Sequence, residues 1–299
     1  MRRRTVALAL SALAAAASGC GERPEPRGDL PPPYPVTVTG AGDEPLVVRA
    51  APRRIVALDP GPAELAARLG SGRRLVGVPA GTRLPGGRRG RAVVTNPGGT
   101  VRVAATAELR PDLLLATETT DTVDLARAEQ RSGARVYVQP ADSVADVVRG
   151  ALELGFVLGE PAQGRRLAGV IRRRTEAAEA RVAGRRPVRV FVDLGFLVTV
   201  PESSLLGDLV RRAGGASVAG PNPGADPLTP CEIARRRPAV ILVVAPAGAP
   251  PPRRSPYACR GRTPARVVAI REEIVTVAGP RVAASVTLIA RALHPDAFA

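Results

Sequence analysis

Lysine and tryptophan are absent from this sequence, and histidine occurs once. All 43 basic residues are arginine, and the single histidine is His294. A zinc or manganese site built from protein side chains needs several histidines and carboxylates around one ion. We therefore expect no bound metal and assign His294 a packing or surface role.

Aromatic residues are scarce, at 2% of the chain, although the formal net charge is +16. Proteins that bind single-stranded nucleic acid combine basic grooves with aromatic side chains that stack on bases. Here the arginines are scattered along the chain and few aromatic residues accompany them, so we expect no nucleic-acid partner. A basic surface favours anionic ligands or anionic lipid headgroups instead.

Sequence patterns typical of catalysis are also missing. There is no G-x-S-x-G element, and the glycines near residues 40–42 and 70–72 do not continue as a dinucleotide or phosphate-binding fingerprint. Glu118 and Asp121 are too close together in one loop to indicate more than solvated carboxylates. We predict no catalytic residue, no cofactor and no enzymatic activity.

The first twenty residues have the features of an export signal. A basic start, an apolar run at residues 6–17 and small residues before Cys20 form a signal peptide at residues 1–19. The segment from Ala17 to Cys20 resembles a lipobox, which predicts that Cys20 is lipidated; the alternative is an ordinary secretory signal. We expect an extracytoplasmic protein, lipid-anchored to the outer face of the cytoplasmic membrane.

Proline dominates the segment that follows, residues 20–36, which cannot bury a core. An extended proline-rich tether of this length reaches roughly 50 Å at about 3.1 Å per residue. Further along the chain, Cys231 and Cys259 form an even pair in an oxidising compartment, which favours a disulfide between them. Two separate buried thiols remain the alternative.

Short apolar segments alternate with amphipathic ones along the first half of the exported chain. The apolar segments are nearly continuous, as expected for parallel strands covered by helices on both faces. Between the first two, Pro62 and Gly70 mark the start and end of a helix. The strands are predicted at residues 55–58, 75–78, 113–116 and 136–138.

The second half repeats this pattern. A helix is predicted over residues 205–213, with Ser203 or Ser204 as its N-cap and glycines after it. In both halves a proline, Pro111 or Pro238, precedes a buried strand. The strands are predicted at residues 189–192, 240–244, 267–270 and 274–277. This alternation predicts an α/β fold of two Rossmann-like lobes.

A long helix is predicted between the two halves. Residues 143–146 start one helix, and Pro161 opens a second that runs to about residue 183, a length of about 34 Å. We therefore predict a single long backbone helix joining the lobes, with the ligand cleft between them. The predicted boundaries are 37–159 for the N-terminal lobe, 160–184 for the interlobe helix and 185–299 for the C-terminal lobe.

Several motifs, in their order and spacing, resemble those of one known family. They are P-x-R-I-V-x-L at residues 52–58, L-R-P-D-L at 109–113, the helix and glycine turn at 205–219, and L-H-P at 293–295. Together they resemble the helical-backbone (class III) periplasmic binding proteins of ABC importers for cobalamin, haem and ferric siderophores. The resemblance implies a monomer that captures a metal chelate or corrinoid and delivers it to a membrane permease.

The sequence departs from that family at the residues that would dock on the permease. Family members usually carry one docking glutamate on each lobe, seven residues before the lobe's proline, where this chain has Ala104 and Cys231. Glu108 and Glu232 lie nearby and are the candidates for this contact, although on a helix each residue turns the side chain by about 100°. The alternative is a degenerate relative that acts as a sensor or interaction protein without a transporter.

Loops at the carboxyl ends of the predicted strands are the expected ligand site, because ligands of parallel α/β sheets bind there. Phe196 and Tyr257 offer aromatic surface, and pockets combine apolar walls with a few polar groups. A stiff connecting helix predicts little closure on ligand binding. The predicted ligand-binding residues are Asp59, Pro60, Asn96, Thr117, Glu118, Phe196, Leu197, Ser203 and Tyr257.

Overall fold

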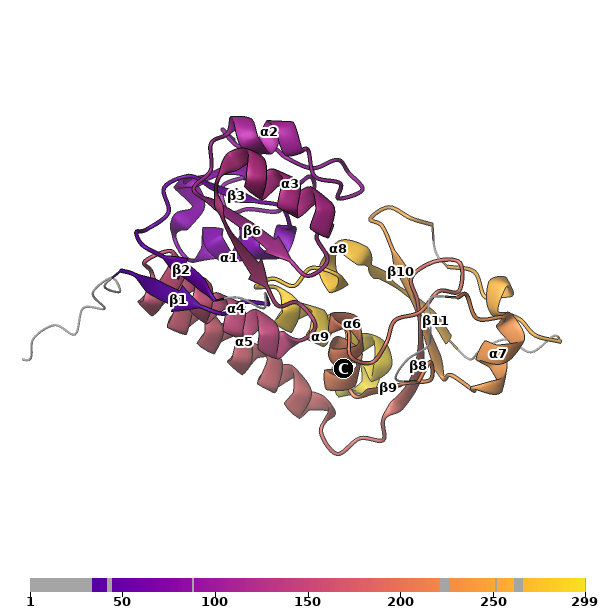
Figure 1. The fold of residues 1–299 in the computed structure, drawn as a ribbon. Coiled ribbons are helices and arrows are strands. Elements are labelled where there is room, and N and C mark those ends of the chain that lie inside the picture. Colours follow the sequence, from indigo (N-terminus) through magenta and orange to yellow (C-terminus); the bar gives the residue numbers. More distant parts are fainter. Residues whose placement is uncertain are drawn as a thin grey trace, which may run out of the picture. The chain divides into compact units, whose positions relative to one another are not determined.

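The computed structural model describes residues 34–41, 45–87, 89–220, 226–250, 252–260 and 266–298 (Figure 1). The predicted signal peptide, Cys20 and the tether up to residue 33 lie outside the described residues. The end of the predicted tether is part of the fold. Tyr34 donates a hydrogen bond from its hydroxyl to the Val157 carbonyl at 2.9 Å, and β1 (Val36–Val38) pairs antiparallel with β2 (Leu46–Val48).

The first of two larger sheets has five parallel strands in the order β5-β4-β3-β6-β7. Both of its faces are buried. In β3, Ile55 and Ala57 face one hydrophobic core, while Val56 faces a second core on the opposite side. The strands are β3 (Ile55–Ala57), β4 (Leu75–Val78), β5 (Ala92–Val93), β6 (Leu113–Thr117) and β7 (Arg135–Gln139). The helical segments between and after them are α1 (Pro60–Arg68), the 3-10 turn η1 (Ser71–Arg73), α2 (Val103–Glu108), α3 (Thr122–Ser132) and α4 (Val144–Val157).

The second sheet has four parallel strands in the order β11-β10-β8-β9. Its central strands also alternate between two cores, since Val190 and Leu242 face the core shared with the first sheet and Phe191 and Ile241 face a separate one. The strands are β8 (Val188–Asp193), β9 (Gly215–Ser217), β10 (Val240–Ala245) and β11 (Arg266–Arg271). The helical segments are α6 (Leu205–Arg212), α7 (Pro230–Arg235), η2 (Ser255–Tyr257), α8 (Glu272–Val275), α9 (Val282–Leu293) and η3 (Pro295–Ala297).

A single long helix, α5 (Pro161–Val182), connects the two sheets along the chain (Figure 1). Pro161 occupies its first turn, where the missing N–H has no intrahelical partner to lose. The helix packs against α4 and α9. The approach to α4 is close because Gly155 faces Gly164: a methyl group added at Gly155 would lie 2.9 Å from the Gly164 Cα. The predicted fold class, two α/β lobes with parallel sheets joined by one backbone helix, is confirmed. The exact lobe boundaries stay a prediction.

One predicted strand is wrong. Residues 274–277 were expected to form a strand, but residues 272–275 form the short helix α8, which starts directly where β11 ends. Two acidic residues, Glu272 and Glu273, occupy the first turn of α8, where the helix dipole favours negative charge. The apolar residues of this segment therefore bury Val275 without joining the sheet.

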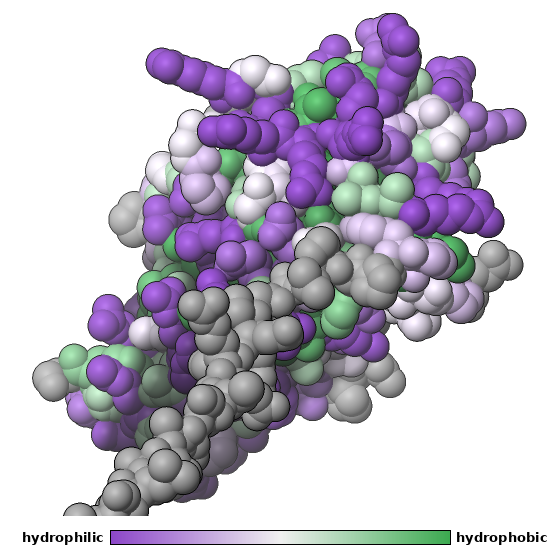
Figure 2. All heavy atoms as spheres, turned by 90° about the vertical axis from the view of Figure 1, so that its left-hand side faces the viewer, coloured by the Kyte–Doolittle hydropathy of each residue, from purple (hydrophilic) through white to green (hydrophobic). Residues whose placement is uncertain are grey.

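None of the described helices is both long and apolar enough to cross a membrane. On the face shown in Figure 2, hydrophilic residues project from much of the surface, and the hydrophobic residues visible there are scattered among them. The described part of that face therefore presents mainly charged and polar groups to its surroundings.

Candidate ligand-binding cleft

A cavity of about 330 Å³ lies where the carboxyl ends of strands from both sheets come together. Ligands of parallel α/β sheets bind at this position, so the cavity is the candidate binding cleft. From the first sheet it is lined by Asp59, Pro60, Gly61, Thr117, Thr119, Ala141 and Asp142. From the second lobe it is lined by Leu194, Val200, Ser204, Leu205, Leu206 and the segment from Val275 to Ala278.

Asp59 gives the first wall of the cleft a fixed carboxylate. It precedes α1, yet its side chain makes no capping bond to that helix. Its Oδ2 accepts hydrogen bonds from the Thr117 N–H, at 2.9 Å, and from the Thr120 hydroxyl. The hydroxyls of Thr117 and Thr119 are hydrogen-bonded at 2.8 Å. The ends of β3 and β6 are thereby held together and present hydroxyls and a carboxylate to the cavity.

Two other residues expected on this wall lie outside the cavity. The carboxylate of Glu118 accepts a hydrogen bond from the Ala141 N–H at 3.1 Å, and the residue is exposed without lining the cleft. Asn96 is exposed at the start of a turn, where its N–H donates to the Thr100 carbonyl at 2.9 Å. Of the predicted residues of the first lobe, the structure therefore brings together Asp59, Pro60 and Thr117.

On the second lobe, the turn after β8 holds Phe196 out in solvent with 94% of its surface exposed. Phe196 and Leu197 adopt φ values of 54° and 64°, which non-glycine residues rarely adopt. The Asp193 carboxylate stabilises this turn, because its Oδ1 accepts from the N–H groups of Gly195 and Leu197 at 2.8 and 3.0 Å. Neither Phe196 nor Leu197 lines the cavity, whereas Leu194 does.

Tyr257 is buried and does not reach the cavity. Its hydroxyl donates to Asp193 Oδ2 at 2.6 Å. Burial and this hydrogen bond raise the pKa of Tyr257, so the hydroxyl remains a donor at neutral pH. The sequence suggested a pocket aromatic, but the structure places Tyr257 beneath the Phe196 turn as a support for the Asp193 carboxylate.

The sequence left open whether Ser203 or Ser204 caps α6. Ser204 accepts from the Gly207 N–H at 3.2 Å and lines the cavity, whereas Ser203 is exposed and does neither. Sequence analysis did not identify Leu206 or the segment 275–278 as lining the cavity. Their apolar character is visible in the sequence, but their place in the cleft depends on packing between segments far apart in the chain.

Direct bonds between the lobes fix the width of the cleft. The Gln139 side-chain amide donates to the Ala278 carbonyl at 2.8 Å, and Arg281 pairs with the buried Glu64 through two contacts of 2.7 and 2.9 Å. Gly61 lies directly against Ala278, and a methyl group there would overlap the Ala278 carbonyl oxygen. These contacts hold α1 and β7 against the segment that precedes α9.

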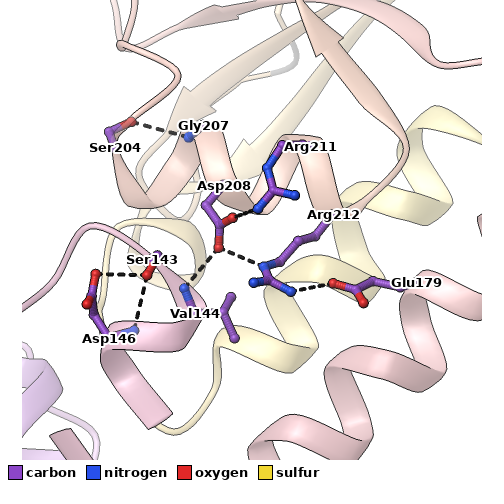
Figure 3. Close-up of polar contacts among 9 residues, drawn as sticks. All are labelled: Ser143, Val144, Asp146, Glu179, Ser204, Gly207, Asp208, Arg211 and Arg212. Carbon is purple, nitrogen blue, oxygen red and sulfur yellow. Dashed lines mark hydrogen bonds and ion pairs between the residues drawn. The ribbon is translucent and has the colours of Figure 1, made fainter. Parts of the chain in front are cut away.

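A second set of bonds, centred on Asp208 of α6, also connects the lobes (Figure 3). Asp208 Oδ2 accepts from the Val144 N–H at 3.0 Å and from Arg212 Nε at 2.7 Å, and Arg212 in turn contacts Glu179 of α5 at 2.5 Å. Burial opposes ionisation of Asp208, but these donors outweigh it and hold the pKa of Asp208 below its ordinary value. The start of α4, the end of α6 and the backbone helix are thus bonded to one another.

The described residues contain no group of three or more histidine, cysteine or acidic side chains arranged to hold a metal ion. His294 is buried, with its Nε2 3.0 Å from the Gly214 carbonyl oxygen. Its ring therefore packs between α9 and the segment before β9.

Residues 55–252 match the sequence pattern of a family described as periplasmic binding protein. The chain belongs to the periplasmic binding protein family. A curated relative, a cobalamin-binding protein of Halobacterium salinarum, is 28% identical over 190 residues, which are 62% of this chain and 51% of the relative. The chain thus spans about half the length of the curated relatives it matches.

Solved structures of similar fold support the architecture. The periplasmic vitamin B12 binding protein BtuF of Vibrio cholerae superposes with a TM-score of 0.72 at 20% identity, covering 83% of this chain and 98% of BtuF. A periplasmic haem-binding protein from Pseudomonas aeruginosa gives a TM-score of 0.70 at 20% identity, covering 82% and 93%. At this identity the likeness establishes the fold, two lobes and a backbone helix.

The positions considered for permease docking differ between the lobes of this periplasmic binding protein. On the first lobe, Ala104 and Glu108 are both exposed on α2. On the second, a disulfide joins Cys231 to Cys259, the pair for which the sequence favoured one. The neighbouring Glu232 completes the capping box of α7 with the N-cap residue Thr229. Its carboxylate accepts from the Thr229 hydroxyl and N–H, both at 2.7 Å, and these bonds hold the pKa of Glu232 below its ordinary value. The Glu232 carboxylate is therefore already bonded within the lobe.

Proposed function

We propose that this protein is an extracytoplasmic solute-binding lipoprotein of an ABC importer, which captures an iron-siderophore, haem or cobalamin-type ligand and delivers it to a membrane permease. The observation that carries the proposal is the cleft at the carboxyl ends of two parallel sheets in a chain of the periplasmic binding protein family. Relatives named for cobalamin and haem binding support the ligand class.

Ligand capture would use Asp59, Pro60 and Thr117 on the first lobe and Leu194 with the Phe196 turn on the second. Small-molecule pockets typically have volumes of about 300–1,000 Å³, and the cleft lies at the lower end with about 330 Å³. It would hold one part of a large chelate or macrocycle. The exposed Phe196 ring offers an apolar face for a part that extends beyond the cavity.

Binding would proceed with little movement of the lobes. Closure would have to break bonds such as Gln139 to Ala278 and Glu64 to Arg281, which already join the lobes without ligand. A buried ion pair is costly to break because it leaves an unpaired charge behind. Selectivity would therefore come from a largely preformed cleft, and the occupied protein would be recognised by its permease.

A thermal-shift screen against a ferric siderophore, haem and cyanocobalamin tests this proposal. A ligand at one hundred times its dissociation constant stabilises the protein by about 2.7 kcal/mol. The variant Thr119→Trp, which fills the cleft from an exposed position, should abolish the shift. The matched control Thr122→Trp, exposed at the start of α3 and outside the cavity, should retain it. No shift with any of the three, or equal shifts in both variants, would refute the proposed site and ligand class.

A degenerate binding protein that senses its ligand without a transporter is the second candidate function. The observation that favours it is the disulfide at Cys231, one of the two positions where family members usually carry a docking glutamate. Genes for a permease and an ATPase beside this gene would favour import, and reconstituting their products in liposomes would then separate the two functions. Stimulation of ATP hydrolysis by the occupied protein supports import, and ligand binding without stimulation supports the sensor.

A further inference from the structure

A second cavity, of about 510 Å³, lies along the backbone helix between α5, α9 and the end of α1. It shares no lining residue with the binding cleft. It is larger than that cleft and lies within the range of small-molecule sites. We call it the backbone groove; nothing in the proposed transport function uses it.

The floor of the backbone groove is apolar. Leu167 and Val170 stand three residues apart on α5, and Ala284 and Leu288 stand four apart on α9, so each pair lies on one face of its helix. Leu288 is 36% exposed and is one of the few large hydrophobic side chains that the described residues leave open to solvent. An apolar strip between two helices suits an unbranched hydrocarbon chain.

The rim of the groove is cationic. Arg68, Arg174, Arg281 and Arg291 come from α1, α5, the start of α9 and its last turn. Arg281 is neutralised by Glu64. Among the described residues, Arg68 and Arg174 form no hydrogen bond or ion pair. Arg291 lies over the Phe298 ring, 5.4 Å from its centre, and it forms no ion pair with an acidic side chain that the structure describes.

The acidic residues of α5 do not compensate this charge. Glu176 contacts Arg172 and Glu179 contacts Arg212, at 3.9 and 2.5 Å. A guanidinium binds carboxylate or phosphate groups through two parallel hydrogen bonds. The rim therefore attracts an anion directly beside the apolar floor.

We propose that the backbone groove binds a single-chain amphipathic anion in solution, an acyl chain that ends in a carboxylate. The chain would lie on the floor between α5 and α9, and the head group would pair with Arg174 and Arg291. A groove of about 510 Å³ is too small to hold a two-chain phospholipid, so the proposed ligand has a single chain. Because α1, α5 and α9 all line the groove, its ligand would contact both lobes and the helix between them.

Isothermal titration with dodecanoate, kept below its micelle-forming concentration, tests the proposal. We expect one site per protein, and at least tenfold weaker binding of butyrate, which lacks the long chain, and of dodecyltrimethylammonium, which carries the opposite charge. The double variant Arg174→Gln/Arg291→Gln should weaken dodecanoate binding at least tenfold. Ala284→Phe fills the floor from an exposed position without changing the charge and should have a similar effect.

The control variant Arg127→Gln/Arg131→Gln removes the same charge from exposed positions of α3, away from the groove, and should bind dodecanoate like the native protein. Equal losses in the control and groove variants would overturn the proposal, because they would indicate attraction by net charge alone. So would equal binding of dodecyltrimethylammonium, or binding to vesicles of anionic phospholipid without any binding of dodecanoate. None of these results depends on whether the cleft binds a metal chelate or corrinoid.

Discussion

Replacing Asp208 by asparagine tests how the lobes are held together. The Asp208 side chain is 9% exposed and accepts bonds from Val144, Arg211 and Arg212 (Figure 3). Asparagine has the same shape but no charge, and its amide group is a donor that would face donors already present. The exchange removes the acceptor that bonds α6 to the first turn of α4.

The expected loss of unfolding free energy is about 3 kcal/mol. A hydrogen bond to a charged group contributes about 1.5–3 kcal/mol, and breaking a buried ion pair costs about 3–5 kcal/mol. The lower part of that range applies, because Arg212 keeps its contact with Glu179 and Arg211 is 68% exposed. Urea unfolding at pH 7, followed by circular dichroism, measures the difference.

The pH dependence gives this prediction a second readout. The folded-state pKa of Asp208 lies below the ordinary value of 3.8, so its carboxylate stabilises the fold fully above about pH 5. That contribution is lost as the pH falls through the lowered folded-state value. The native protein and Asp208→Asn should therefore differ at pH 5–7 and converge towards pH 2.

Asp124→Asn is the matched control. Asp124 also lies in the first turn of a helix and faces an arginine three residues on, but its contact with Arg127 is 3.9 Å long and Arg127 is 65% exposed. It should lose about 1 kcal/mol or less. The reasoning is refuted if Asp208→Asn costs no more than this control, or if its deficit persists unchanged at pH 2.

Three further substitutions test the cleft. Gly61→Ala should lower the unfolding free energy by about 1–3 kcal/mol in urea titrations, because the added methyl group meets the Ala278 carbonyl. The control Gly98→Ala, at a position with open space around it, should change the unfolding free energy by less than about 0.5 kcal/mol. Phe196→Ala should leave the thermal midpoint of the free protein unchanged, since the ring is exposed. It should weaken binding of the ligand found in the screen about tenfold in titration calorimetry, a difference of about 1.4 kcal/mol. Unchanged affinity would show that the turn does not contact the ligand. Tyr257→Phe should lower the unfolding free energy by about 1.5–3 kcal/mol, because it leaves the buried Asp193 carboxylate with one donor fewer. An unchanged unfolding free energy would show that the hydrogen bond from Tyr257 to Asp193 does not stabilise the Phe196 turn.

Local sequence signals accounted for most of the secondary structure. Ser143 at the start of α4 and Pro161 at the start of α5 mark helix ends through bonds or constraints within a few residues, so they were predictable without tertiary information. The same reasoning failed at residues 274–277, because an apolar run of four residues fits a buried strand or a buried helix equally well. What decided between them was the position of this run at the end of β11, followed by its packing against α9.

The cleft was predictable only in part. Thr117 is the last residue of a buried strand and Asp59 lies two residues after another, so the rule that ligands bind at the carboxyl ends of parallel strands identified them. Tyr257 and Ser203 satisfied the same chemical criteria, but Tyr257 is buried under the Phe196 turn and Ser203 is exposed outside the cavity. Side-chain direction within a loop depends on its neighbours in space, which the order of residues does not specify.

By itself, then, the sequence determined two features: the alternation of buried strands with amphipathic helices, and the stiff helix between the two halves. Both depend on periodicity, helix caps and proline positions within short segments. Only the tertiary structure decided which loops meet, that Ala278 lies against Gly61 and that Asp208 bonds to Val144. It also placed the arginines of α1, α5 and α9 around one groove. Such contacts join residues far apart in the chain, and they form only when whole elements have packed on one another.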